Sequence, residues 1–334
     1  MVVEHRWRGD ARRARPGGSG SVTTATIDPA TAVVPPKIRA ATPGRTRLLR
    51  AVYAVSAFAL VAVVWELVKV LVPADGVRIA GTRVLPRTSD GALPHVWAVF
   101  TVLGEPDGNG TVGETLVRTA MFTLGLSVLA LSLGAVVGVA LAVAMQRFGW
   151  LERALLPYVV LSQTVPLIAL APLVAAWGGK LAIGGEPWRP WMSIVVIAAY
   201  LAFFPIAIGM LRGLQAPSAA SVELLRSCSA GWWATLRRLR FPAAVPSLIP
   251  ALRLAAAAAV VGAVVAEIST GTAGGIGRQI IVFSQQATGD SARLYAAVLT
   301  AALLGVVLTA LVGLVELALR RYSHPPSTGP TVER

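Results

Sequence analysis

The sequence contains few of the residues that carry enzyme and metal chemistry. Its one cysteine, Cys228, excludes a disulfide within the chain, and its three histidines do not have the spacing of a metal site. The glycine-rich stretch "GTAGGIGRQI" (271–280) lacks both the spacing and the lysine of a phosphate-binding loop. We therefore expect no catalytic residue, no metal and no cofactor in this chain, and we do not expect it to be an enzyme.

Charged residues are also scarce. They make up 14% of the chain and hydrophobic residues 55%, whereas a soluble domain carries about 25% charged residues. This composition predicts an all-α integral membrane protein whose surroundings are the lipid bilayer. The net charge of +14 does not indicate nucleic-acid binding, because the basic residues gather in the expected loops without a stripe of stacking aromatics.

The apolar residues gather in six stretches, and a helix needs roughly 20 such residues to cross the hydrocarbon core. We expect transmembrane helices over residues 48–72, 116–145, 154–177, 190–213, 248–269 and 294–319. The third stretch contains Pro157, Pro166 and Pro172, so it should be kinked or broken. In the second, Gly134 and Gly138 form a small face that permits close helix packing.

These stretches divide the chain into four parts. Residues 1–46 have no apolar periodicity and predict a disordered tail; residues 47–112 hold the first transmembrane helix and a loop; residues 113–319 form a core with five transmembrane helices; and residues 320–334 form a second tail. The tails and the loops 146–153 and 212–247 hold about twenty Lys and Arg residues, against about seven in the other loops. Both termini should therefore be cytoplasmic, in a cell (inner or plasma) membrane.

Polar residues interrupt the third stretch. In "LSQTVPLIALAP" (161–172), Ser162, Gln163 and Thr164 stand beside Pro166. Polar groups at such a place either bond to neighbouring helices or line a watery path for a solute, and a proline-interrupted helix is a common site for such a path. The sequence leaves these two interpretations open.

Acidic residues within the expected spans are few. Glu66, Glu267 and Glu316 lie near different helix ends, and we expect Glu66 to pair with Lys69 on one helix face. Glu267, near the outer end of the fifth span, is a weaker candidate for a gate in the same path. None of these positions resembles the midplane titratable group that an ion-driven carrier needs.

The loop between the fourth and fifth spans, residues 216–247, is too long for a simple helical hairpin and poor in glycine. Apolar residues recur at helical spacing over 219–230 and 232–239, with Ala230 and Gly231 at the junction. We expect two short amphipathic helices. Such basic helices either lie on lipid headgroups or dock in a groove of a soluble partner through tryptophan and arginine, and the pattern alone does not decide between them.

The loop resembles the cytoplasmic EAA loop of binding-protein-dependent ATP-binding-cassette importer permeases. Glu223 and the Phe241-Pro242 pair have the separation of that motif, and Pro246 and the Ala266-Glu267 pair continue it. The family's Glu-Ala-Ala reads Glu-Leu-Leu here, and Ser229 stands where the family has glycine. "SQTVPLIALAPLVAAWG" is similar to the third span of the nitrate, taurine and aliphatic sulfonate branch, and to permeases for thiamine precursors.

The resemblance implies a type I importer permease fold with six transmembrane helices. It also implies a homodimer, cytoplasmic ATPase subunits that bind the ATP, and an extracytoplasmic substrate-binding protein. The residues implied to couple to the ATPase are Glu223, Leu224, Leu225, Arg226, Ser229, Ala230, Gly231, Trp232 and Pro242, and Pro242 with Pro246 should turn the chain sharply into the fifth span. The translocation path is expected at Ser162, Gln163, Thr164, Pro166 and Glu267.

Two other functions remain as alternatives at this point. One is a membrane scaffold protein whose basic loop binds anionic lipid, and the other is a carrier driven by an ion gradient. The solute, which the resemblance narrows to a sulfonate-like anion or a thiamine or pyrimidine precursor, is not fixed by the sequence.

Overall fold

The computed structural model describes residues 43–74, 78–79, 82–83, 88–108, 110–287 and 291–319. The expected tail 320–334 lies outside this part of the chain, as does the tail 1–46 except for residues 43–46, which are helical. The chain divides into two units, Met1–Ala57 and Phe58–Arg334. The described part of the first unit is the beginning of helix α1 (Pro43–Leu71).

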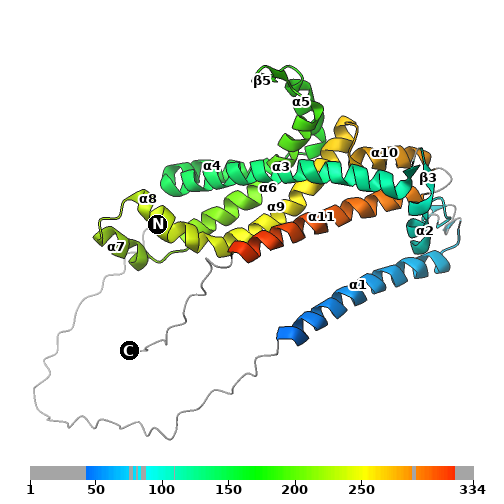
Figure 1. The fold of residues 1–334 in the computed structure, drawn as a ribbon, viewed down its shortest axis with the longest axis horizontal. Coiled ribbons are helices and arrows are strands. Elements are labelled where there is room, and N and C mark those ends of the chain that lie inside the picture. Colours follow the sequence, from blue (N-terminus) through cyan, green and yellow to red (C-terminus); the bar gives the residue numbers. More distant parts are fainter. Residues whose placement is uncertain are drawn as a thin grey trace, which may run out of the picture. The chain divides into compact units, whose positions relative to one another are not determined.

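The second unit continues from α1 through a series of helices and short hairpins (Figure 1). The helices are α2 (Val96–Thr101), α3 (Val112–Arg147), α4 (Gly149–Ser162), α5 (Leu167–Gly178), α6 (Pro190–Gln215), α7 (Ala219–Ser227), α8 (Trp232–Thr235), α9 (Phe241–Thr270), α10 (Ile276–Gln286) and α11 (Ala292–Leu319). A 3-10 turn (Val102–Gly104) follows α2, and a π-helical turn (Leu236–Arg240) joins α8 to α9.

Three antiparallel hairpins connect these helices. Strands β1 (Arg78–Ile79) and β2 (Thr82–Arg83) follow α1, β3 (Pro106–Asp107) and β4 (Gly110–Thr111) precede α3, and β5 (Ala182–Ile183) and β6 (Glu186–Pro187) precede α6. The second hairpin leads into α3 through a capping box. Thr111 accepts a hydrogen bond from the Glu114 N–H, and the Glu114 carboxylate accepts one from the Thr111 N–H.

The all-α membrane fold is confirmed. Four helical stretches of the described chain are long and apolar enough to span a bilayer: Val112–Arg147, Pro190–Gln215, Trp232–Thr270 and Ala292–Leu317. The bent pair α4 and α5 makes a fifth if it counts as one span. The expected span 48–72 falls in α1, several of whose side chains lie outside the described part, so the sixth crossing stays a prediction.

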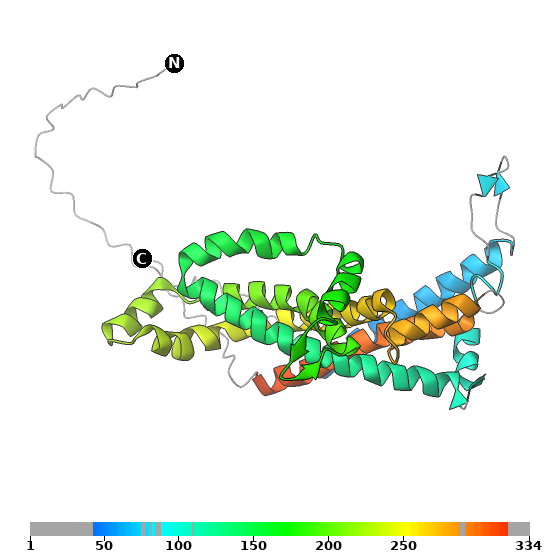
Figure 2. The same ribbon diagram turned by 90° about the horizontal axis from the view of Figure 1, so that it is seen from above.

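Helix α6 packs against both α3 and α9, and Figures 1 and 2 show α11 running beside α9. Small residues allow the close approach, as the glycine face of α3 predicts. A Cβ at Gly138 would lie 2.8 Å from the Phe203 carbonyl oxygen on α6, and one at Gly213 on α6 would lie 2.6 Å from Ala244 Cα on α9. Backbone contacts this close let the helices bury their apolar faces against each other.

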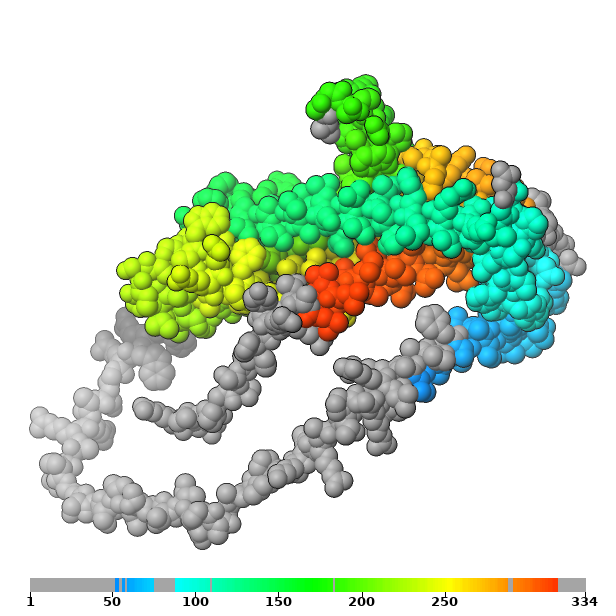
Figure 3. Space-filling model, in the orientation of Figure 1, coloured from blue at the N-terminus to red at the C-terminus, as the bar shows by residue number. Residues whose placement is uncertain are grey.

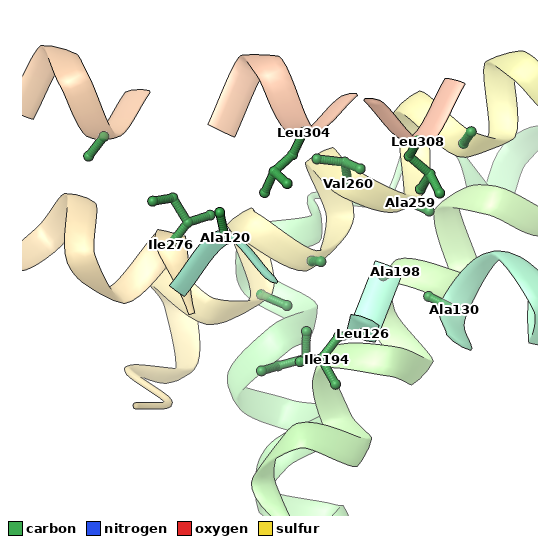
Figure 4. Close-up of a cluster of buried hydrophobic side chains, with 14 of the residues drawn as sticks. Ala120, Leu126, Ala130, Ile194, Ala198, Ala259, Val260, Ile276, Leu304 and Leu308 are labelled. Atoms are coloured by element: carbon green, nitrogen blue, oxygen red, sulfur yellow. The ribbon is translucent and has the colours of Figure 1, made fainter. Parts of the chain in front are cut away.

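One cluster of buried side chains joins α3, α6, α9 and α11. In Figure 4, Leu304 and Leu308 of α11 lie against Val260 and Ala259 of α9, and Ile194 of α6 lies near Leu126 of α3. All are buried hydrophobic residues. Burial of such side chains is worth about 1.5–3 kcal/mol each for the larger ones when the reference is water. In lipid the gain comes from close packing instead.

The C-terminal end of α1, within the second unit, is held by the segment before α2. The Glu66 carboxylate accepts hydrogen bonds from the Val96 N–H at 2.7 Å and pairs with His95 Nδ1 at 2.9 Å. Lys69 donates to the Asp90 carboxylate and to the Leu93 carbonyl. The expected Glu66–Lys69 pair is therefore replaced by bonds from each residue to residues 90–96, which a spacing rule for one helix does not foresee.

Candidate coupling loop and translocation path

The third apolar stretch is broken, as its prolines predict. Helices α4 and α5 meet at an angle of 103°, with Pro157 and Pro172 retained inside the two helices and Pro166 as the N-cap of α5. The break is therefore confined to residues 163–166. Pro166 interrupts the apolar stretch because it lacks the backbone N–H that a continuing helix would need, and α5 starts directly after it.

Hydroxyl groups satisfy the backbone at this break. Ser162 Oγ donates to the Val159 carbonyl at 2.7 Å, and Thr164 Oγ1 donates to the Leu161 carbonyl at 2.8 Å. Tyr200 of α6 donates its hydroxyl to the Ser162 carbonyl. Gln163 reaches only the Ser162 hydroxyl, at 3.4 Å, so its amide remains the most available polar group of the break.

The expected path residues lie together at the bend but differ in exposure. Thr164 and Pro166 are exposed, while Ser162 and Gln163 are half-buried. Beyond the bend, α5 and the β5–β6 hairpin project from the neighbouring helices (Figure 3). The sequence did not indicate Tyr200, because a single tyrosine in an apolar helix has no distinguishing pattern.

Glu267 lies elsewhere, at the end of α9, and its side chain is fully buried. Its carboxylate accepts a hydrogen bond from Thr123 Oγ1 on α3 at 2.8 Å and another from the Gly277 N–H on α10 at 2.8 Å. The structure thus places Glu267 at a junction of three helices, apart from the α4–α5 bend. Its role as a gate stays a prediction.

All three acids of the expected spans are bonded. The carboxylates of Glu66 and Glu267 accept hydrogen bonds from backbone N–H groups, and Glu316 on α11 forms an ion pair with Arg253 on α9. Arg253 lies well inside α9, which begins at Phe241. Each of these carboxylates therefore has a bonded partner on another segment.

The loop between α6 and α9 contains the two short helices that its periodicity predicts. Helix α7 begins at the N-cap Ser218, whose hydroxyl accepts a hydrogen bond from the Ser221 N–H. It ends in a Schellman motif: the Ser229 N–H donates to the Arg226 carbonyl at 2.9 Å and the Ala230 N–H to the Leu225 carbonyl at 3.0 Å. The turn between α7 and α8 is therefore fixed by hydrogen bonds.

Ser229 occupies the left-handed position of this motif, with φ of 55°, and it is the one non-glycine residue with positive φ in the described chain. Left-handed backbone costs an L-residue roughly 1–2 kcal/mol, and glycine avoids that cost. The position where the resembling family has glycine is thus the position where this backbone favours one. Gly231, two residues later, has an ordinary extended φ and serves as the N-cap of α8.

The two tryptophans of α8 pack edge to face, with ring centroids 4.6 Å apart, but they differ in exposure. Trp232 is half-buried, with the Arg147 guanidinium 5.3 Å from its ring centroid, whereas Trp233 is 69% exposed. On α7, Leu224 is 66% exposed and Leu225 is half-buried. Leu224 and Trp233 are therefore the large apolar side chains that α7 and α8 present outward, while Trp232 contacts Arg147 at the end of α3.

The expected sharp turn at Pro242 and Pro246 is absent. The chain runs as one apolar helical stretch from Trp232 to Thr270, with Pro242 in the first turn of α9. Pro242 cannot donate a backbone hydrogen bond to the turn before it, and the π-helical turn there accommodates the change in backbone pairing. Arg240 in that turn donates to the Leu214 carbonyl at the end of α6, at 2.9 Å.

Residues 116–321 match the family model of the binding-protein-dependent transport system inner membrane component. This chain belongs to that family. The match covers the helices from α3 onward and includes both the loop and the α4–α5 break. The family assignment confirms the resemblance seen in the loop sequence and makes the chain a multi-pass membrane transport subunit.

Three relatives to which this chain is similar differ in the solute that they are named for. The riboflavin transport system permease protein RibX of Chloroflexus aurantiacus is 31% identical over 173 residues, 52% of this chain and 60% of that protein. The formylaminopyrimidine transport permease protein ThiX of Halalkalibacterium halodurans is 34% identical over 145 residues, 43% and 54%. The putative aliphatic sulfonates transport permease protein SsuC of Bacillus subtilis is 26% identical over 168 residues, 50% and 56%.

The matched part of the permease spans 54–60% of the length of these three relatives. They come from the two branches that the sequence suggested, vitamin precursors and sulfonates. The coupling and path assignments of individual residues stay predictions.

Proposed function

We propose that this chain is the permease subunit of an ATP-driven importer and that α7 and α8 dock on a separate cytoplasmic ATPase. The observation that carries the proposal is the pair of exposed apolar side chains, Leu224 and Trp233, on a loop whose backbone is fixed at both ends. A displacement applied there passes directly into α9, because the helical stretch from Trp232 to Thr270 is continuous.

The charges beside this surface support docking on a protein. Glu223 and Arg226 are exposed on α7, and Arg237 and Arg238 are exposed on the π-helical turn, so both signs of charge flank the apolar pair. Mixed charges around an apolar centre are typical of a protein interface, where they set register. A surface for anionic lipid would carry basic residues alone.

The remaining partners follow the family. Two copies of the chain would form the translocation path, since the α4–α5 bend leaves the polar groups of Gln163 and Thr164 outside the packed core. An extracytoplasmic binding protein would deliver the solute, and the excess of basic residues in the α7–α8 loop and the tails supports a cytoplasmic location for that loop.

The solute is proposed to be a small organic molecule, either a vitamin or pyrimidine precursor or a sulfonate. The residues of the break, 162–166, are neutral and offer hydroxyl and amide groups. Such groups suit a ring with hydrogen-bonding substituents better than a bare anion, which would require a compensating charge. Uptake of formylaminopyrimidine, riboflavin and an alkanesulfonate by cells that express the complete transporter distinguishes these solutes.

The docking experiment compares Leu224→Asp with Ala219→Asp in the tagged full-length chain, extracted in detergent. Both positions are exposed on α7, but Ala219 lies on a different side of the helix, in its first turn, where an added carboxylate is tolerated. Leu224→Asp should reduce ATPase co-purification at least tenfold, and Ala219→Asp should change it little.

Failure of the ATPase to co-purify with the unaltered chain would refute the proposal. In that case, binding to vesicles of anionic phospholipid would favour the scaffold function. Uptake that persists after ATP depletion but stops with an uncoupler would favour the ion-driven carrier.

A further inference from the structure

A buried carboxylate joins three helices at the end of the molecule opposite the α7–α8 loop. Glu267 Oε2 accepts a hydrogen bond from the Gly277 N–H, and Glu267 Oε1 accepts one from Thr123 Oγ1. Thr123 Oγ1 in turn accepts a hydrogen bond from the Ile276 N–H at 2.9 Å. The first two N–H groups of α10, which have no partner within their own helix, are thus bonded to residues of α9 and α3.

The sequence around this junction is shaped to admit the carboxylate. A Cβ at Gly275 would lie 2.1–2.3 Å from the carboxyl atoms of Glu267, and a Cβ at Gly277 would lie 2.6 Å from the Val264 carbonyl oxygen. Any larger residue at either position would force the first turn of α10 away from α9. The glycine-rich stretch 271–280, which is no phosphate-binding loop, therefore has a structural role.

The strength of this attachment follows from its burial. Thr123, Glu267, Ile276 and Gly277 are all buried, so water does not compete for their hydrogen bonds. A buried polar group that loses its hydrogen-bond partner costs more than the bond itself contributes, so these contacts resist separation of the helices. The arrangement is therefore stable only while α3, α9 and α10 keep their relative positions.

The same arrangement fixes a polar hollow of about 490 Å³ beside the β3–β4 hairpin. Its lining includes Arg118 of α3 and Gln279 of α10, together with Asp107, Glu114 and Thr115. Gln279 lies two residues after Gly277, so the position of the first turn of α10 determines the position of this side of the hollow. Arg118 is exposed and lies one and a half turns before Thr123 on α3.

We propose that Glu267 and Thr123 are positioning residues that fasten α10 to α3 and α9, so that the polar hollow keeps its shape as α9 moves. The hollow would then present a constant surface to the protein that delivers the solute. The second statement rests on the proposed function, whereas the first does not.

The test uses Thr123→Val and Thr123→Ser in the full-length chain in lipid nanodiscs, with amide hydrogen exchange measured by mass spectrometry. Valine has the shape of threonine but removes the hydroxyl's contacts with Glu267, with the Ile276 N–H and with the Thr119 carbonyl of its own helix, and serine keeps them. The matched control is Thr300→Val, because the Thr300 hydroxyl bonds only to the Ala296 carbonyl of its own helix. Exchange over residues 276–283 should rise at least tenfold in Thr123→Val and stay within twofold in the other two variants, with α6 unchanged in all.

Glu267→Gln provides a second variant that preserves shape and loses the charge, and we expect a rise of about threefold to tenfold in the same exchange. Unchanged exchange over 276–283 in both Thr123→Val and Glu267→Gln would overturn the proposal. An equal rise in Thr300→Val, or a rise that includes α6, would also overturn it, because the effect would then be general loosening.

The role of the hollow is tested with the assembled transporter and its purified binding protein. The binding-protein concentration for half-maximal stimulation of ATP hydrolysis should rise at least fivefold in Thr123→Val, with the maximal rate changed less than twofold. An unaltered transporter that shows no such stimulation would refute the proposed function, while the exchange result would still decide the role of Thr123 and Glu267. Stimulation that is unchanged in Thr123→Val despite faster exchange would overturn the role of the hollow.

Discussion

The guanidinium of Arg147, the last residue of α3, lies 5.3 Å from the ring centroid of Trp232, the first residue of α8. This contact joins the docking loop to a helix that precedes it by some eighty residues in sequence, and a second bond, from Arg240 to the Leu214 carbonyl, joins it to α6. The loop is therefore attached to α3, α6 and α9 together. Displacement of the loop should move all three helices.

Replacing Arg147 with alanine should weaken this attachment. A cation–π contact contributes about 0.5–2 kcal/mol, so Arg147→Ala should lower the thermal unfolding midpoint in detergent and reduce solute uptake per ATP hydrolysed. ATPase co-purification should persist, because Leu224 and Trp233 are unchanged. The control is Arg153→Ala, an exposed arginine on α4; equal effects from both variants would show that the contact with Trp232 contributes nothing specific.

Ser229→Gly should be neutral or stabilising. The serine has φ of 55°, and glycine removes the roughly 1–2 kcal/mol cost of that backbone conformation, offset in part by the greater freedom of glycine in the unfolded chain. Ser227→Gly, in the last turn of α7, should instead destabilise by about 0.5–1 kcal/mol, because its backbone is helical. Thermal unfolding of the two variants checks the opposite signs, and a large loss of uptake in Ser229→Gly would contradict the assignment of the turn.

Gly213→Ala should destabilise the packing of α6 on α9. The added Cβ would lie 2.6 Å from Ala244 Cα, and overpacking of this kind costs about 1–3 kcal/mol. Gly125→Ala on α3 meets no atom within 4 Å and should raise stability slightly through helix propensity. The stability of both variants is measured as the fraction of protein that stays monodisperse after heating in detergent. If Gly213→Ala retains as much monodisperse protein as Gly125→Ala, α6 and α9 can move apart at this contact without cost.

Glu316→Gln should leave the Arg253 charge without its carboxylate partner. The cost should be about 1–2 kcal/mol, because Arg253 is half-exposed and partly screened while Glu316 is nearly buried. The double exchange Arg253→Glu with Glu316→Arg should recover part of the lost thermal stability. The control Glu186→Gln removes an exposed ion pair with Arg189 at the β5–β6 hairpin and should have no measurable effect on thermal stability. An equal loss of thermal stability in Glu186→Gln and Glu316→Gln would show that the Arg253–Glu316 pair contributes no more than a surface pair.

Sequence patterns predicted the features that depend on nearby residues. The apolar stretches, the break at Pro166 and the two short loop helices all follow from periodicity and proline positions, which act over a few residues. The glycine face at Gly134 and Gly138 was also predicted, and it packs on α6 as close approach requires.

The features that were missed depend on residues far apart in sequence. Glu267 meets Thr123 across 144 positions, and no local rule selects one threonine among several on α3. Trp232 and Trp233 look alike in sequence, and the contact that distinguishes them, Arg147 over the Trp232 ring, comes from the distant end of α3. Pro242 was wrongly expected to turn the chain, because its effect depends on whether a helix already exists before it.

The uninterrupted helical stretch of 39 residues from Trp232 to Thr270 is about 58 Å long at 1.5 Å per residue, nearly twice the roughly 30 Å hydrocarbon core. The stretch is therefore longer than one crossing requires, and if residues 248–269 form the crossing, the extra length lies on the side of residues 232–247, next to the α7–α8 loop. A rigid tilt of so long a stretch about a point in the membrane would carry its two ends in opposite directions, so a displacement at the docking loop would be felt at the junction of α9 with α10.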